Sequence, residues 1–159
     1  MIKFLSRLTI LIVMLLITSC SSSEKANAEL LLEVKKIEIN AWLNLMPGVS
    51  PGKFHLTGEV TLQNQSDEEI KNISLKNITV YSSEEVIYSF KPYFTNKMEE
   101  DNFNLIKGMA KVFRFGMEEE LKIDKRLAKN KIININLEFV SDKRSYTYSV
   151  DSVEVEEAY

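Results

Sequence analysis

Histidine, cysteine and tryptophan each occur only once in the 159 residues, as His55, Cys20 and Trp42. A single cysteine cannot form an intramolecular disulfide, so hydrophobic burial has to hold the fold together. Nucleophilic catalysis by a Cys–His or Ser–His pair also needs an orienting group, and neither a second histidine nor another cysteine exists to supply one. The sequence therefore predicts a protein that is not an enzyme.

Long apolar runs are missing as well. The run at residues 8–17 follows Lys3 and Arg7 and is shorter than the roughly 20 residues that span a bilayer. An uncleaved membrane anchor is the competing interpretation of this segment. A basic start, a short apolar run and small residues before Cys20 instead predict a secretory signal peptide.

The residues Ile17-Thr18-Ser19-Cys20 resemble the lipobox of bacterial lipoproteins, the sequence that a signal peptidase recognises. The resemblance implies cleavage after Ser19 and attachment of lipid to Cys20, which would hold the protein on a membrane. Ser21 follows the cysteine, and by the same resemblance its identity suggests the outer membrane, facing the periplasm or the exterior. We expect a signal peptide at 1–19, a lipidated tether at 20–29 and a folded domain at 30–159.

The charge balance argues against nucleic acid as a partner. Without Lys3 and Arg7 the chain carries 18 basic and 23 acidic residues, an excess of five negative charges. Nucleic-acid-binding surfaces are basic instead. A chain of about 140 residues is long enough to bury one core, so we expect one domain.

Apolar residues alternate with polar ones along most of this domain, which predicts strands. The parity changes at Lys35-Lys36, and this predicts a β-bulge or a change of sheet. A hairpin joins 37–45 to 54–62 in the predicted register Leu45 opposite Phe54, which sets Leu43 opposite Leu56.

A second hairpin near the C-terminus pairs Phe139 with Tyr146 and Ile135 with Val150, and a further change of parity predicts a bulge at Asp151-Ser152. Between the hairpins we expect strands at 72–81, 85–91 and 109–115 and a surface loop at 92–105. Residues 117–130 permit either helical turns or a strand from Glu119 to Ile123. About seven strands favour an antiparallel two-sheet sandwich over a sheet closed on itself.

The stretch from Leu56 to Tyr81 resembles immunoglobulin-like modules of bacterial secreted lipoproteins. The residues that carry the resemblance are Gly58-x-Val60-x-Leu62-x-Asn64, then Ile73-x-Leu75 and Ile78-x-Val80-Tyr81. The resemblance implies an all-β immunoglobulin-like sandwich and no particular activity.

Strand parity places Trp42 on the polar face of its strand, with Asn40 and Asn44 and near His55 and Thr57. A rigid aromatic side chain gives a large contact area at a low entropic cost. Trp42, His55 and Thr57 are therefore the candidate binding residues. The competing interpretation is that strand twist or a neighbouring segment covers Trp42.

A periplasmic copper-binding protein is the alternative function. Imidazole and thioether groups suit Cu(I), and His55 could combine with the methionines at 46, 98, 109 and 117. Periplasmic copper chaperones share the immunoglobulin-like fold but use pairs of histidine and methionine, which this chain lacks. The sequence therefore favours a lipid-anchored, non-catalytic binding or accessory module of the cell envelope, with no cofactor, no metal and an unidentified envelope protein as its partner.

Overall fold

The computed structural model describes residues 31–48, 52–96, 103–142 and 144–159. The expected signal peptide, with Ile17, Thr18 and Ser19, and the expected tether, with Cys20, lie outside the described residues. The unit Leu31–Tyr159 contains the whole of the fold below.

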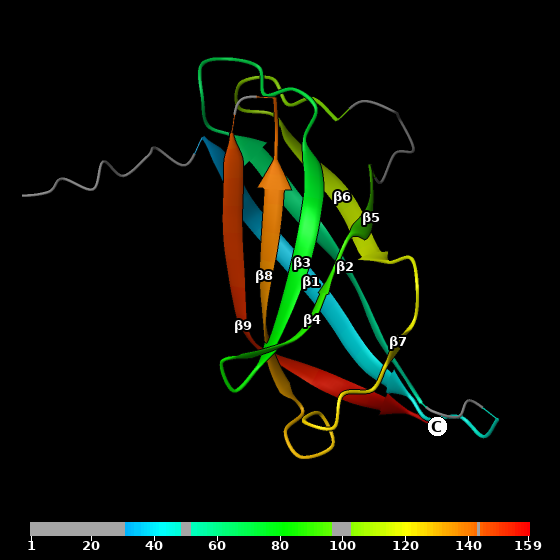
Figure 1. Ribbon diagram of the computed structural model, residues 1–159. Coiled ribbons are helices and arrows are strands. Elements are labelled where there is room, and N and C mark those ends of the chain that lie inside the picture. The colour runs from blue at the N-terminus through cyan, green and yellow to red at the C-terminus, as the bar shows by residue number, and fades with distance from the viewer. Residues whose placement is uncertain (1–30, 49–51, 97–102, 143) are drawn as a thin grey trace, which may run out of the picture. The chain divides into compact units, whose positions relative to one another are not determined.

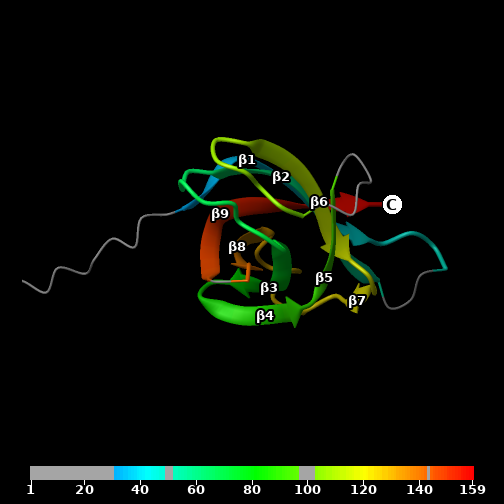
Figure 2. The same cartoon turned by 90° about the horizontal axis from the view of Figure 1, so that it is seen from above.

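The described residues form nine strands, which confirms the all-β prediction. The strands are β1 (Leu32–Asn44), β2 (Lys53–Asn64), β3 (Ser74–Ser82), β4 (Glu85–Phe90), β5 (Pro92–Asn96), β6 (Ala110–Met117), β7 (Leu121–Lys122), β8 (Ile132–Val140) and β9 (Ser145–Ala158). They form one sheet in the order β4-β3-β8-β9-β1-β2-β6-β5, with β7 beside β2. The sheet is mixed, because β1 and β9 are parallel and the other pairs are antiparallel, and it curls around its buried face (Figures 1 and 2).

The first hairpin forms as expected, but its predicted register is wrong by two residues. Leu43 pairs with Phe54 and Ala41 with Leu56, whereas Leu45 lies beyond the end of β1. The amide of Leu45 donates to the carbonyl oxygen of Ala158 at 2.8 Å. Contact with β9 thus places Leu45 outside the β1–β2 pairing and lengthens the connection between these two strands. A register shift of two residues keeps the same side chains facing the core. The bulge expected near Lys35 is present between Val34 and Lys36.

The second hairpin has the predicted register: Phe139 pairs with Tyr146 and Ile135 with Val150. The bulge expected at Asp151-Ser152 is also present. Ser152 has a positive φ of 59°, and its amide donates to Oδ1 of Asn134 at 3.0 Å. After this bulge β9 pairs with β8 for two more residues, Val153 and Glu154, and from Val155 it continues beside β1.

Two segments between the hairpins differ from expectation. The stretch from Pro92 to Asn96, expected within a loop, is edge strand β5, because Phe94 stacks on Phe113 with ring centroids 4.8 Å apart. Proline at the first position of an edge strand interrupts no ladder. The ambiguous segment contains β7 at Leu121–Lys122 and then hydrogen-bonded turns, so the strand alternative holds only for two residues.

The core fills the concave side of the sheet. Leu43, Leu56, Ile135 and Leu137, all predicted to be core residues, are at most 3% exposed. Thr57, Asn134 and Asn136, predicted to face outward, are partly exposed. Four aromatic rings occupy one end of the core, namely Phe94, Phe103, Phe113 and Phe139.

The two ends of β1 differ in what surrounds them. Leu31, just before β1, accepts a hydrogen bond from the Gln65 amide at 2.7 Å and lies near the β2–β3 connection. Trp42 lies 11 residues further along, roughly 35 Å away at the usual rise of a strand. Leu31 and Trp42 are therefore near opposite ends of β1, a strand that runs along the length of the sheet in Figure 1.

Candidate functional site

The structure brings Trp42 and His55 together as direct cross-strand neighbours on β1 and β2. Their rings are stacked, with centroids 5.0 Å apart and an interplanar angle of 5°. Ala41 and Leu43 on either side of Trp42 are each 3% exposed, so the indole lies on the opposite, outer face of the sheet, where it is partly buried. The predicted register placed His55 opposite Asn44 instead, and the two-residue shift corrects this.

His55 has an unusual polar environment. Its side chain is 21% exposed, and its Nε2 atom is buried without a hydrogen bond in the described part of the chain. Oε1 of Glu120, just before β7, lies 3.5 Å from this atom. A protonated imidazole would therefore face a carboxylate on one side and the indole of Trp42 on a ring face.

Thr57 lies two residues along β2 from His55 and pairs with Asn40. Thr57 and Asn40 line a hollow of about 450 Å³ on the outer face of the sheet. Tyr93 forms another part of this hollow, and its ring lies over Gly116, where a Cβ atom would come within 2.7 Å of the tyrosine oxygen. Sequence analysis placed Tyr93 in a loop, as an aromatic residue that could be exposed or covered, and did not bring it next to Thr57; the glycine at 116 is the signal that could have suggested a covering aromatic ring.

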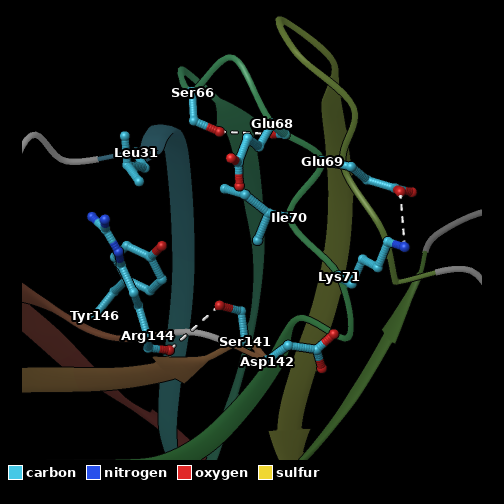
Figure 3. Close-up of a pocket in the computed structure, with 10 residues that line it drawn as sticks. All are labelled: Leu31, Ser66, Glu68, Glu69, Ile70, Lys71, Ser141, Asp142, Arg144 and Tyr146. Atoms are coloured by element: carbon cyan, nitrogen blue, oxygen red, sulfur yellow. Dashed lines mark hydrogen bonds and ion pairs between the residues drawn. The ribbon is translucent and has the colours of Figure 1, made fainter.

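A second hollow, about 350 Å³ in volume, lies at the end of the sheet that carries Leu31 (Figure 3). Leu31, the β2–β3 connection and the turn between β8 and β9 contribute its walls. Sequence analysis did not identify it, because its residues come from three separate segments and form no motif.

The ion pairs that Arg126 makes have a structural role. Arg126 binds Asp124 through Nε and Nη2, at 2.8 and 2.7 Å, and Glu85 through Nη1 at 2.7 Å. These bonds lower the pKa of Asp124 to about 2, with the side-chain hydrogen bond from Arg126 as the largest cause. The cluster fastens the β7–β8 connection to β4. Its two carboxylates, those of Asp124 and Glu85, are already bound by Arg126.

Other candidate chemistry has little support from the described geometry. No serine was expected to lie in a nucleophile-elbow sequence, yet Ser50 stands in Gly-x-Ser-x-Gly. This sequence joins β1 to β2, whereas a nucleophile elbow joins a strand to a helix. Ser50 itself lies outside the described residues. Within the described ranges no three His, Cys, Asp or Glu side chains form a metal-binding group. Met98 lies outside these ranges.

No family model, curated protein or solved structure matches the chain. Among residues 31–48, 52–96, 103–142 and 144–159, no helix is long and apolar enough to cross a membrane.

Proposed function

We propose that this protein is a lipid-anchored, non-catalytic binding module of the bacterial cell envelope. In this proposal lipid on Cys20 attaches it to the outer membrane, and a partner protein of the envelope binds the outer face around Trp42, His55 and Thr57. The stacked Trp42–His55 pair on that face is the observation that carries the proposal. An immunoglobulin-like relationship of the curled sheet is part of the same proposal.

The stacked pair has the properties of an interface anchor. Aromatic residues dominate binding energy at protein interfaces, and a side chain that is already fixed loses little conformational entropy when a partner binds. Stacking against His55 restricts the Trp42 indole, and β1 is held between β9 and β2 at this position. The hollow next to Thr57 offers polar groups beside this anchor, as expected of an interface with an apolar centre and a polar rim.

The position of the pair favours a partner away from the lipid layer. Ten residues lie between Cys20 and Leu31, and the stretch from one to the other spans at most about 40 Å when fully extended. Trp42 lies at the other end of β1 from Leu31, so the pair is not on the end of the sheet to which the tether is joined. A protein partner within the envelope suits this geometry better than the membrane that holds the anchor.

The substitution Trp42→Ala tests the proposal. We expect it to reduce capture of the envelope partner in a pull-down by about thirtyfold, because loss of an aromatic anchor typically costs about 2 kcal/mol of binding free energy. The melting temperature should change by only a few degrees. Tyr81→Ala is the matched control, since Tyr81 is also a partly exposed aromatic residue of a strand, and it should leave capture unchanged.

The opposite result would assign Trp42 to the core. Truncation of a buried tryptophan costs about 3 to 5 kcal/mol of unfolding free energy. A large fall in the melting temperature of Trp42→Ala, with partner capture reduced only in proportion to the folded fraction, would overturn the proposed binding surface.

A further inference from the structure

Trp42 stands in a row of side chains that crosses three strands on the outer face of the sheet. Its register partner on β2 is His55, and its register partner on β9 is Glu156. The neighbouring pair of Ala41 and Val155 is buried on the inner face, so Glu156 shares the outer face with Trp42. The indole therefore has an imidazole on one side and a carboxylate on the other.

His55 covers one face of the indole, and the other face is directed towards β9. The ring centroids of Trp42 and His55 are 5.0 Å apart, and the rings are nearly parallel. This separation is close to the spacing of neighbouring strands, about 4.8 Å, so the rings face each other along the line that runs from strand to strand. The second face of the indole is thus directed at β9, which lies beside the end of β1 (Figure 1).

The outer face beside this second ring face is acidic. Glu156 is exposed, and in the described part of the chain it makes no hydrogen bond or ion pair. Glu154, two residues earlier on β9, is exposed as well. Lys131 is also close to β9, but its ammonium is paired with Glu157 at 2.8 Å. The carboxylate of Glu156 is therefore available to a partner.

The opposite side of the stacked pair has mixed charge. Lys53 and Lys122 are register partners on β2 and β7, in the row next to His55. Glu120 lies beyond His55, with Oε1 3.5 Å from Nε2 of the imidazole. Positive and negative groups are thus both present on the β2 side. Only the β9 side of Trp42 combines an aromatic face with negative charge alone.

A guanidinium complements both features of the β9 side. It is planar and stacks on an aromatic ring, and it binds a carboxylate through two parallel hydrogen bonds. An ammonium is a compact charge that cannot lie flat on the indole. A phosphate or carboxylate would be repelled by Glu156, and an apolar group would leave this carboxylate without a contact.

We propose that the outer face binds an arginine side chain of the partner protein. The guanidinium lies against the second face of the Trp42 indole and donates to the carboxylate of Glu156. The existence of a protein partner rests on the proposed function, to which this adds the chemistry by which the partner is recognised.

The first experiment follows the fluorescence of Trp42, the only tryptophan of the chain, in the full-length protein in a nonionic detergent. The probes are three short glycine peptides that carry one arginine, one lysine or one citrulline, which is a neutral analogue of arginine. We expect the arginine peptide to bind at least tenfold more tightly than the citrulline peptide and at least threefold more tightly than the lysine peptide. A single side chain binds weakly, so the titration extends to tens of millimolar peptide.

Substitutions locate the binding. Glu156→Gln should weaken binding of the arginine peptide at least threefold and leave binding of the citrulline peptide unchanged. Asp151→Asn is the matched control, because Asp151 is an exposed carboxylate of the same strand that does not pair with β1. It should change the affinity less than twofold.

Three results would overturn the proposal. Equal affinity for the arginine and citrulline peptides would show that positive charge is not recognised. Equal binding by wild type and Glu156→Gln, with the variant folded by circular dichroism, would place the binding away from Glu156. A fluorescence that stays constant over the whole titration would show that this face has no arginine site.

The second experiment separates the arginine from the proposed function itself. Capture of the envelope partner is compared for wild type, Trp42→Ala and Glu156→Gln. Both variants should reduce capture, Glu156→Gln by at least threefold. Reduced capture by Trp42→Ala alone would leave the proposed binding surface in place and overturn the arginine. Unchanged capture by Trp42→Ala would overturn the binding surface, whatever the peptides do.

Discussion

At the scale of single residues, Asp124 shows how one ion pair fastens a connection that sequence periodicity could not assign. Its carboxylate accepts three bonds from Arg126, from Nε, Nη2 and the main-chain amide, and its own amide donates to the hydroxyl oxygen of Tyr88 at 2.7 Å. The side-chain bonds from Arg126, followed by the bond from its amide, lower the pKa of Asp124 to about 2 from an ordinary 3.8. A carboxyl whose pKa is lower in the folded state contributes stability above its unfolded pKa and loses that contribution as the pH falls towards the folded value.

Asp124→Asn should therefore lower the melting temperature at pH 7, and the difference from wild type should shrink between pH 4 and pH 2. Thermal melts at pH 7, 4 and 2 would measure this. Glu119→Gln, an exposed carboxylate in the β6–β7 connection, is the control and should change the melting temperature little. A difference for Asp124→Asn that is the same at all three pH values would show that the ion pair does not stabilise the fold.

Residue parity predicted which face of the sheet carries Trp42, but not which residue of the neighbouring strand lies opposite it. Alternation along 37–45 correctly separated the outer Trp42 from the buried Ala41 and Leu43. Parity repeats every two residues, so it cannot distinguish registers that differ by two, and both place apolar residues inward. The stacking of Trp42 on His55 therefore emerged only from the structure.

At the scale of elements, strands with regular alternation were predictable, and those defined by distant contacts were not. The β8–β9 hairpin has a short turn and a clear pattern, and its register was correct to the residue. Strand β5 depends on stacking of Phe94 against Phe113 and on pairing with β6, contacts that have no local signature. The two-residue strand β7 is too short to show any period.

Two strand glycines differ in what encloses them, and this predicts different costs of substitution. A Cβ atom at Gly58 would meet Cζ of Phe115 at 2.4 Å and the main-chain oxygen of Glu38 at 2.5 Å. Gly58→Ala should lower the unfolding free energy by about 1 to 3 kcal/mol, and Phe115→Leu should not rescue it, because the main-chain oxygen cannot move away.

Gly116→Ala is the comparison, since its Cβ would meet only ring atoms of Tyr93 at 2.7 to 2.9 Å. Its cost should fall sharply in a Tyr93→Ala background. Denaturant unfolding of the single and double variants gives these energies. Rescue of Gly58→Ala by Phe115→Leu would contradict the role assigned to the main chain of β1.

At the scale of the whole molecule, the sheet is mixed, whereas all of its strands were expected to be antiparallel. The parallel contact of β1 with β9 joins the two hairpins into one curled sheet. This contact links segments more than a hundred residues apart, and neither strand carries a pattern that specifies it. The hollow at the Leu31 end was hidden for the same reason, since it exists only where three distant segments meet.

The proposed lipid anchor predicts a specific state of the chain in cells. We expect mass spectrometry of the membrane fraction to find a protein that begins at acylated Cys20, because the resemblance of residues 17–20 to a lipobox implies cleavage after Ser19. Cys20→Ala should release the protein from the membrane or leave the signal peptide attached. Ser19→Ala conserves a small residue before the cysteine and should still be processed. A wild-type protein that retains residues 1–19 would contradict the anchor.

The place of β9 beside β1 also bears on the order in which the molecule can assemble. β1 is among the first described segments of the chain, yet it lies between β2 and the last strand, so the middle of the sheet stays incomplete until residues near 158 are present. Contacts between such distant segments slow folding. A chain that leaves the cell interior as proposed would thus remain threadable through a narrow secretion channel, and the fold would close only after its C-terminal end had emerged on the far side.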